Sequence, residues 1–184
     1  MRRARNGQSL ARLLEETTGI PIQIITGDQE AYYDFLAVRQ TMPVEDALII
    51  DTGGGSCELI LMRGRTCVEK TSLPIGSVVL SEKYTERGDL SAAAIFRLFN
   101  HVHARLSPID WLREARNLPV IALGGNHRAI GKIYKNNCDE DAPLHGLQIT
   151  RDHLNSIYID LLDADSNRRQ AMLGKNKDRS DIIS

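Results

Sequence analysis

Two hydrophobic runs, residues 47–50 and 59–62, flank a stretch of small residues in the first half of the chain. Short apolar runs bounded by turn residues are typical of buried strands. After a tight turn at residues 63–65, apolar and polar residues alternate from 66 to 73. The pattern therefore predicts three adjacent strands joined by short turns, which is an antiparallel meander.

Helical periodicity dominates the rest of the chain. Thr26 and Gln29 have the spacing of a capping box, which predicts a helix that starts there and continues through Val38. Residues 91–106 carry apolar side chains on one helical face, at Ile95, Leu98, Phe99, Val102 and Leu106. Further helices are expected at 7–19, 78–84, 111–117, 128–134 and 152–162, separate strands at 21–25, 120–123 and 145–149, and a loop at 135–144.

A second glycine-rich turn follows the short apolar strand at residues 120–123. Gly124 and Gly125 lie between this strand and a helix, so the turn is either a close-packed corner or an anion site at a helix N-terminus. If this strand runs parallel to and beside the one that ends at Asp51, both glycine turns meet at one edge of the sheet. The element order predicts an α/β fold with a mixed sheet flanked by helices.

The first glycine turn carries the main candidate chemistry. Glycines allow successive N–H groups to surround an anion, so the turn is predicted to bind phosphate through Gly53, Gly54, Gly55 and Ser56. A hairpin without a ligand is the alternative. Asp51 stands where an aspartate can hold a hydrated divalent cation. Glu58 is predicted to lie near the same anion, where a carboxylate needs a metal or a proton-transfer role.

Two other polar side chains have competing interpretations. Glu30 falls in the first turn of the predicted helix, where a favourable interaction with the helix dipole explains an acid by spacing alone. His127 follows the second glycine turn, and a capping role is favoured over a contact with a bound phosphate.

Composition narrows the class of protein. The 184 residues have a net charge of -1, so no global field attracts nucleic acid or a membrane surface. No segment approaches the ~18 continuous apolar residues of a membrane span. The cysteines, at 57, 67 and 138, lack CxxC spacing and are expected to be reduced thiols in a cytoplasmic protein.

Taken together, the motifs resemble the Ppx/GppA family of exopolyphosphatases and guanosine pentaphosphate phosphohydrolases, within the actin-like ATPase superfamily. The stretches that carry the resemblance are RRARN at 2–6, ITGDQEA at 25–31, IDTGGGSCEL at 50–59, LPIG at 73–76, ALGG at 122–125 and DRSDII at 178–183. Two positions depart from the family pattern. Cys57 and Asn126 both stand where the family usually has Thr or Ser, and Asn126 puts a hydroxyl contact of the second glycine turn in doubt.

The resemblance implies a fold, a site and a reaction. It implies two ribonuclease-H-like lobes around a cleft, with residues 1–40 as the tail of the first lobe and 41–184 as the second, truncated at its C-terminal end. It implies catalytic roles for Glu30 and Glu58, Mg²⁺ ligation by Asp51 and Glu58, and phosphate binding by Arg2, the residues at 53–56, Gly124 and Gly125.

The implied reaction is hydrolysis of a terminal phosphoanhydride of polyphosphate or pppGpp. A homodimer is expected separately, because truncated lobes expose apolar surface that drives pairing. A non-catalytic sensor of (p)ppGpp or another nucleotide, and a kinase or ATPase of the superfamily, stay open as alternatives. Little activity is expected from these 184 residues alone.

Overall fold

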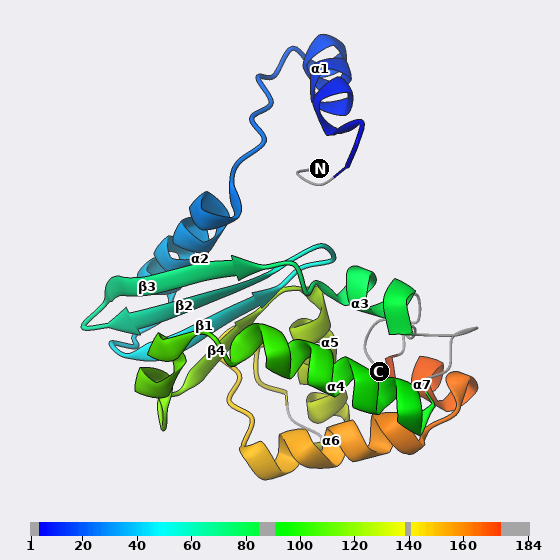
Figure 1. Cartoon of the computed structure of the whole chain (residues 1–184). Helices are drawn as coiled ribbons and strands as arrows, with labels where there is room; N and C mark the ends of the chain where they lie inside the picture. Colours follow the sequence, from blue (N-terminus) through cyan, green and yellow to red (C-terminus); the bar gives the residue numbers. More distant parts are fainter. Residues whose placement is uncertain (1–3, 85–90, 139–140, 174–184) are drawn as a thin grey trace.

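A computed structural model of the chain describes residues 4–84, 91–138 and 141–173 (Figure 1). Arg2 and the 178–183 stretch lie outside the described residues. The strands are β1 (Ala47–Thr52), β2 (Cys57–Arg63), β3 (Thr66–Leu73) and β4 (Val120–Leu123). The helices are α1 (Gly7–Thr18), α2 (Gly27–Thr41), α3 (Ser77–Tyr84), α4 (Ala92–Leu106), α5 (Gly125–Cys138), α6 (Arg151–Asp163) and α7 (Ser166–Leu173), with a 3-10 helix η1 (Asp110–Ala115).

The sheet has the predicted mixed topology. Its strand order is β3-β2-β1-β4, in which β1 and β2 and then β2 and β3 pair antiparallel. β1 and β4 pair parallel, with Ile49 opposite Ile121. The meander and the parallel neighbour are both confirmed, and the glycine turns that follow β1 and β4 leave the sheet at the same edge.

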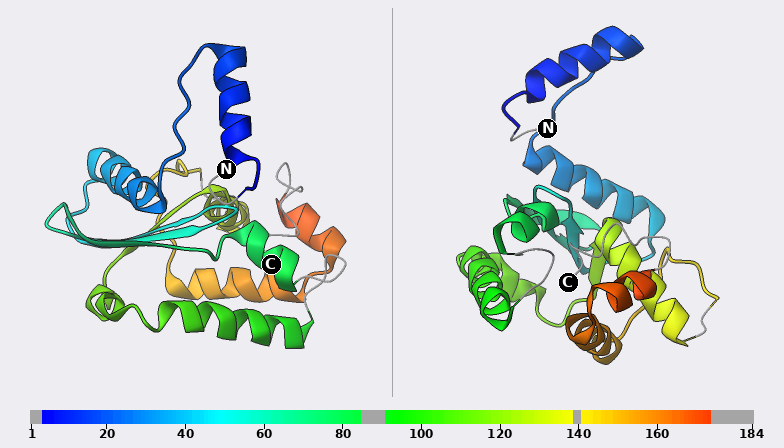
Figure 2. Two further views of the ribbon diagram at one scale, coloured as in Figure 1. Left: turned by 45° about the horizontal axis from the view of Figure 1, so that its top comes forward. Right: turned by 90° about the vertical axis from the view of Figure 1, so that its right-hand side faces the viewer.

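Helices cover the two faces of the sheet (Figures 1 and 2). α2 covers one face, where Phe35 and Val38 pack on Ile49 and Ile60. The other face is apolar at Cys57 and Leu59 and is covered by residues of α4 and η1, namely Val102, Leu106, Trp111 and Leu112. Since side chains alternate between faces along a strand, each position near the glycine turn can be assigned to one of these layers.

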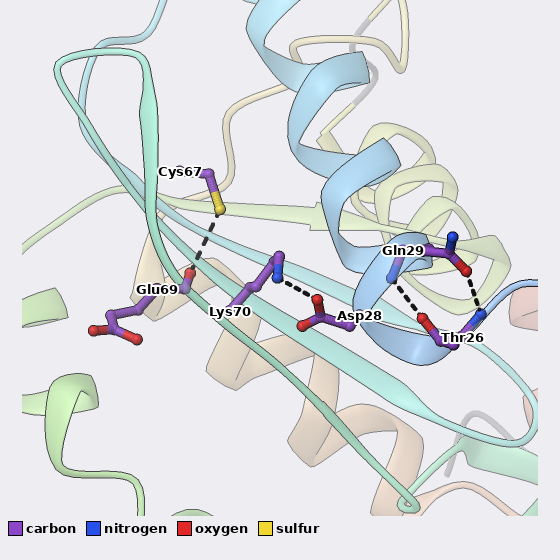
Figure 3. Close-up of polar contacts among 6 residues, drawn as sticks. All are labelled: Thr26, Asp28, Gln29, Cys67, Glu69 and Lys70. Atoms are coloured by element: carbon purple, nitrogen blue, oxygen red, sulfur yellow. Dashed lines mark hydrogen bonds and ion pairs between the residues drawn. The ribbon is translucent and has the colours of Figure 1, made fainter.

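The N-terminal part of α2 is fixed by its own side chains. The Thr26 hydroxyl accepts a hydrogen bond from the Gln29 backbone N–H at 3.2 Å, and the Gln29 side chain accepts from the Thr26 N–H at 2.9 Å (Figure 3). The predicted capping box is therefore confirmed. Because the capping box fixes the first turn of α2, it also fixes the backbone position of Glu30 in that turn.

α1 is set apart from the sheet and is joined to α2 by an extended segment (Figure 1). The predicted strand at 21–25 is wrong, because this segment pairs with no strand among the described residues. Its Ile22 N–H instead donates to the Glu15 carboxylate at 2.8 Å. The predicted division of the chain at residue 40 stays a prediction, although α2 shares its core with the sheet.

The predicted strand at 145–149 is also wrong. Gly146 has φ +76 and lies in a turn, and the apolar residues on either side pack against α5. The apolar spacing therefore serves helix packing, with Ile149 beside the core of α5, α6 and α7. α5 also continues to Cys138, into a region predicted as a loop. No helix in the described ranges is long and apolar enough to cross a bilayer.

Candidate functional site

The candidate site begins as a row of residues across neighbouring strands. Asp51 on β1 lies opposite Glu58 on β2, and Glu58 lies opposite Ser72 on β3. Asp51 is two residues beyond Ile49, and Glu58 two before Ile60, so both acids share the face that α2 covers. The sheet register therefore brings the two predicted acids to one level at the carboxyl end of β1.

Glu58 is held deep in this row. Its exposed fraction is 1%, and its Oε1 accepts a hydrogen bond from the Ser72 hydroxyl at 2.7 Å. A buried carboxylate is costly unless it is hydrogen-bonded, and a bond to a charged group contributes about 1.5–3 kcal/mol. Ser72 thus offsets part of the cost of keeping Glu58 buried.

α2 adds two more carboxylates on the same side. Glu30 and Asp34 are four residues apart, which places them one above the other on a helix. Burial, the largest cause, raises the pKa of Asp34 from 3.8 to about 7. The negative charges that act in the same direction belong to Asp51, Glu30 and Glu58. Glu30 and Glu58 therefore both act on the charge of one carboxyl group, which places the predicted pair on the same side of the sheet.

The sequence interpretation missed Asp34. The available signal was its spacing of four residues from Glu30, because any helix starting at Thr26 places position 34 on the Glu30 face. The apolar neighbours of Asp34 gave no independent reason to select it.

The pKa of Asp51 is influenced by both negatively and positively charged neighbours. Burial and then the charge of Glu30 raise its pKa, while His127 and Arg128 lower it. Its Oδ1 atom is buried and has no hydrogen-bond partner among the described residues. An orphaned carboxylate oxygen at a strand end fits a cation or a hydrated ligand.

The first glycine turn is anchored on one side and open on the other. The Gly53 N–H donates to the Ser56 carbonyl at 3.0 Å, so this predicted phosphate ligand closes the hairpin with its own amide. The Gly53 carbonyl accepts from the Ser77 N–H at 2.9 Å, and the Gly54 carbonyl accepts from the Val78 N–H at 3.0 Å. The N–H groups of Gly54 and Gly55 donate to no other residue within the described ranges, which leaves them available to an anion.

Gly76 is a close neighbour that supports this turn. A Cβ atom at Gly76 would lie 2.4 Å from the Gly54 carbonyl and from the Ser56 nitrogen. Glycine at this position therefore allows the start of α3 to press directly on the turn.

The second glycine turn meets the first, as expected. Gly124 has φ +96, and a Cβ there would lie 2.7 Å from Asp51 Oδ1 and 2.9 Å from the Thr52 carbonyl. Gly125 then begins α5, and Asn126 is 9% exposed in its first turn. His127 Nδ1 donates to the Leu123 carbonyl at 2.5 Å, a contact with the end of β4 and not the capping of a helix N–H that the sequence favoured.

Cys57 faces away from the acids. It belongs to the core cluster on the α4 side of the sheet, and burial raises the pKa of its thiol to about 11. Its nearest polar partner is the Thr52 hydroxyl, with a sulfur to oxygen distance of 3.7 Å. The side chain at this departure from the family pattern therefore lies on the opposite face of the sheet from Asp51 and Glu58.

A metal would find few protein ligands here. Within the described part of the chain, no three His, Cys, Asp or Glu side chains are grouped to hold an ion. Mg²⁺ commonly uses one or two carboxylates and completes its shell with water and substrate phosphates. Asp51, with its orphaned oxygen, and Glu58 fit that mode of binding.

The chain is similar to several known proteins. A Haemophilus influenzae protein named "Putative exopolyphosphatase" is 27% identical over 191 residues, covering 100% of this chain and 56% of that protein. A crystal structure of an exopolyphosphatase from Cytophaga hutchinsonii superposes with a TM-score of 0.88 at 22% identity, covering 99% of this chain and 60% of that one. The crystal structure of the Aquifex aeolicus Ppx/GppA family member superposes with a TM-score of 0.79 at 24% identity, covering 99% of this chain and 59% of that one.

These structures confirm the predicted fold class, the mixed sheet of the ribonuclease-H-like, actin-like ATPase fold. The chain spans less than two thirds of the length of each of these relatives. The sequence profile of the Ppx/GppA phosphatase family matches residues 1–184. The chain therefore belongs to the Ppx/GppA phosphatase family.

Proposed function

We propose that the protein hydrolyses terminal phosphoanhydride bonds and releases orthophosphate from polyphosphate. The observation that carries the proposal is the meeting of carboxylates from α2, β1 and β2 with two glycine turns at one edge of the sheet. The names of two relatives, which include the word exopolyphosphatase, support the same reaction.

In the proposed reaction, the open amides of the first turn and the start of α5 bind the terminal phosphoryl group. Glu30 accepts a proton from a water molecule as the water oxygen forms a bond to phosphorus. The bond from phosphorus to the bridging oxygen breaks on the opposite side, and the shortened chain leaves with the electron pair.

Charge neutralisation has to supply most of the acceleration, because a positioned base contributes about 10²–10⁴-fold. Mg²⁺, when bound through Asp51 and Glu58, would offset the charge of the phosphoryl oxygens. Arg2, by resemblance, would add a positive contact to the phosphate.

The decisive experiment measures orthophosphate release by the full-length protein, from polyphosphate and from pppGpp, with Mg²⁺ and with EDTA. Release from polyphosphate that requires Mg²⁺ is the expected result. Release from pppGpp alone would assign the guanosine pentaphosphate reaction to the same site. Binding of (p)ppGpp with no release from either substrate would replace the hydrolase proposal with a sensor.

The assembly and location are further proposals. We propose a homodimer, which is supported by the apolar residues exposed on α4 and α6, namely Phe96, Phe99, Ile159 and Leu162. We propose a cytoplasmic location from the three cysteines without CxxC spacing. Light scattering of the full-length protein tests the dimer, and fractionation of cells tests the location.

A further inference from the structure

One face of β3 touches both elements that carry the candidate acids. Lys70 lies opposite Ile60 and Ser72 lies opposite Glu58 in the register of β2 and β3. Ile60 belongs to the core beneath α2, so Lys70 and Ser72 project from the sheet on the α2 side. They are two residues apart, the spacing of neighbours on one face of a strand.

The contact from Ser72 reaches Glu58 directly. The hydroxyl donates to Oε1 at 2.7 Å, the usual length of an O–H···O hydrogen bond. Because Glu58 is 1% exposed, its carboxylate has little freedom to exchange this donor for solvent. Ser72 therefore restricts the orientation of the Glu58 carboxylate.

The contact from Lys70 reaches the first turn of α2. Its Nζ lies 2.5 Å from Asp28 Oδ2, and the pair joins two segments 42 residues apart (Figure 3). Asp28 lies two residues before Glu30, in the turn that the Thr26 capping box fixes. The side chain of Lys70 is 26% exposed and that of Asp28 is 66% exposed, so the pair adds little stability. Its geometric effect is to hold the start of α2 against β3.

We propose that β3 sets the distance and orientation between the two candidate catalytic carboxylates, with Ser72 positioning Glu58 and Lys70 positioning Glu30 through Asp28. This inference rests on the proposed hydrolysis and deepens it. Neither Ser72 nor Lys70 needs to touch substrate. Misplacement of a reacting group by about 1 Å can cost about 10²-fold in rate, so weak positioning contacts can have large kinetic effects.

The first test uses Ser72→Ala and Ser72→Thr in the full-length protein. We expect Ser72→Ala to lower kcat about tenfold with KM for polyphosphate changed by less than about twofold, because binding uses the glycine turns. Ser72→Thr keeps a hydroxyl and is expected to recover most of kcat. Thr71→Ala, which lies opposite Leu59 and so faces the other side of the sheet, is the matched control and is expected to keep kcat.

The second test is a double-mutant cycle of Lys70→Met and Asp28→Asn. Each single change is expected to lower kcat about threefold to tenfold, and the double variant to be no worse than either, because both remove one contact. Exchanging the two residues, Lys70→Asp with Asp28→Lys, is expected to restore part of kcat. A rise in KM caused by Lys70→Met and not by Asp28→Asn would overturn the proposal, since it assigns Lys70 to the substrate.

The outcomes separate the two levels of the proposal. An active wild-type protein whose Ser72 and Lys70 variants keep wild-type kcat overturns the positioning role alone. Equal losses in Ser72→Ala and Ser72→Thr also overturn it, because the hydroxyl is then irrelevant. A wild-type protein that releases no phosphate from any substrate overturns the proposed function, and the positioning role with it.

Discussion

Asp51 and Glu58 are direct cross-strand partners, one on each arm of the hairpin that carries the first glycine turn. Like charges placed opposite each other in a sheet repel and destabilise it. At the same edge of the sheet α2 adds Glu30 and Asp34, so acidic side chains are concentrated at this point of the fold. Such a concentration at one strand end is expected of a functional site more than of a structural one.

Glu30→Gln is expected to abolish phosphate release from polyphosphate while substrate affinity stays within about threefold of wild type, because only the proton acceptor is lost. Phosphate release and equilibrium binding to the full-length protein check this. Glu69→Gln, an exposed carboxylate of β3, is the control and should behave as wild type. Unchanged release by Glu30→Gln would remove Glu30 from its proposed role.

Asp34 is expected to make folding stability fall as pH rises. Its pKa is about 7 in the folded chain and 3.8 ordinarily, so between these values the folded state binds more protons than the unfolded state. The stability linked to Asp34 is fully present below pH 3.8 and is lost as pH rises through about 7.

Asp34→Asn removes this titration, so the variant should be more stable than wild type at pH 8 and similar to it at pH 4. Urea unfolding in EDTA at several pH values measures the difference. Asp141→Asn, an exposed position, should follow wild type throughout. A difference between Asp34→Asn and wild type that stays constant with pH would contradict the assignment.

Gly76→Ala is expected to destabilise the fold by about 1–3 kcal/mol and to weaken substrate binding. The added Cβ would meet main-chain atoms of Gly54 and Ser56 at 2.4 Å, and the turn has to shift. Urea unfolding gives the first effect and KM for polyphosphate the second. Gly55→Ala meets nothing within 4 Å and should leave unfolding unchanged, which makes it the steric control.

Mg²⁺ is expected to bind weakly to the protein alone and more tightly in the presence of pyrophosphate, because the described residues offer no group of three ligands. Titration calorimetry with and without pyrophosphate measures the coupling. Asp51→Asn should reduce it by removing an oxygen that has no protein partner. Tight Mg²⁺ binding without any phosphate would show that a fuller ligand set exists.

The sheet could be predicted from the sequence because its signals are local. The apolar runs at 47–50 and 59–62 and the alternation at 66–73 each specify a strand, and the glycines fix where the chain turns. The parallel pairing of β4 followed from a short apolar strand that leads into a helix. The capping box of α2 was equally local.

The predictions that were wrong, and the site residues that were missed, depended on contacts between residues far apart in the sequence. Residues 145–149 have apolar positions that suit a strand, yet α5, α6 and α7 bury Ile149. Residues 21–25 are extended, but extension alone does not supply a pairing strand. The spacing of Asp34 from Glu30 shows only that both lie on one helical face, and the link of Asp34 and Ser72 to Glu58 comes from the placement of α2 and β3 in the fold.

The first glycine turn uses its carbonyl groups and its amide groups differently. The carbonyls of Gly53 and Gly54 accept hydrogen bonds from the start of α3, while the amides of Gly54 and Gly55 donate to no other residue that the structure describes. An anion can therefore bind and leave without a rearrangement of the loop, because the binding conformation of the turn is already formed in its absence. Exchange of product for substrate at this point need not await a conformational change of the hairpin.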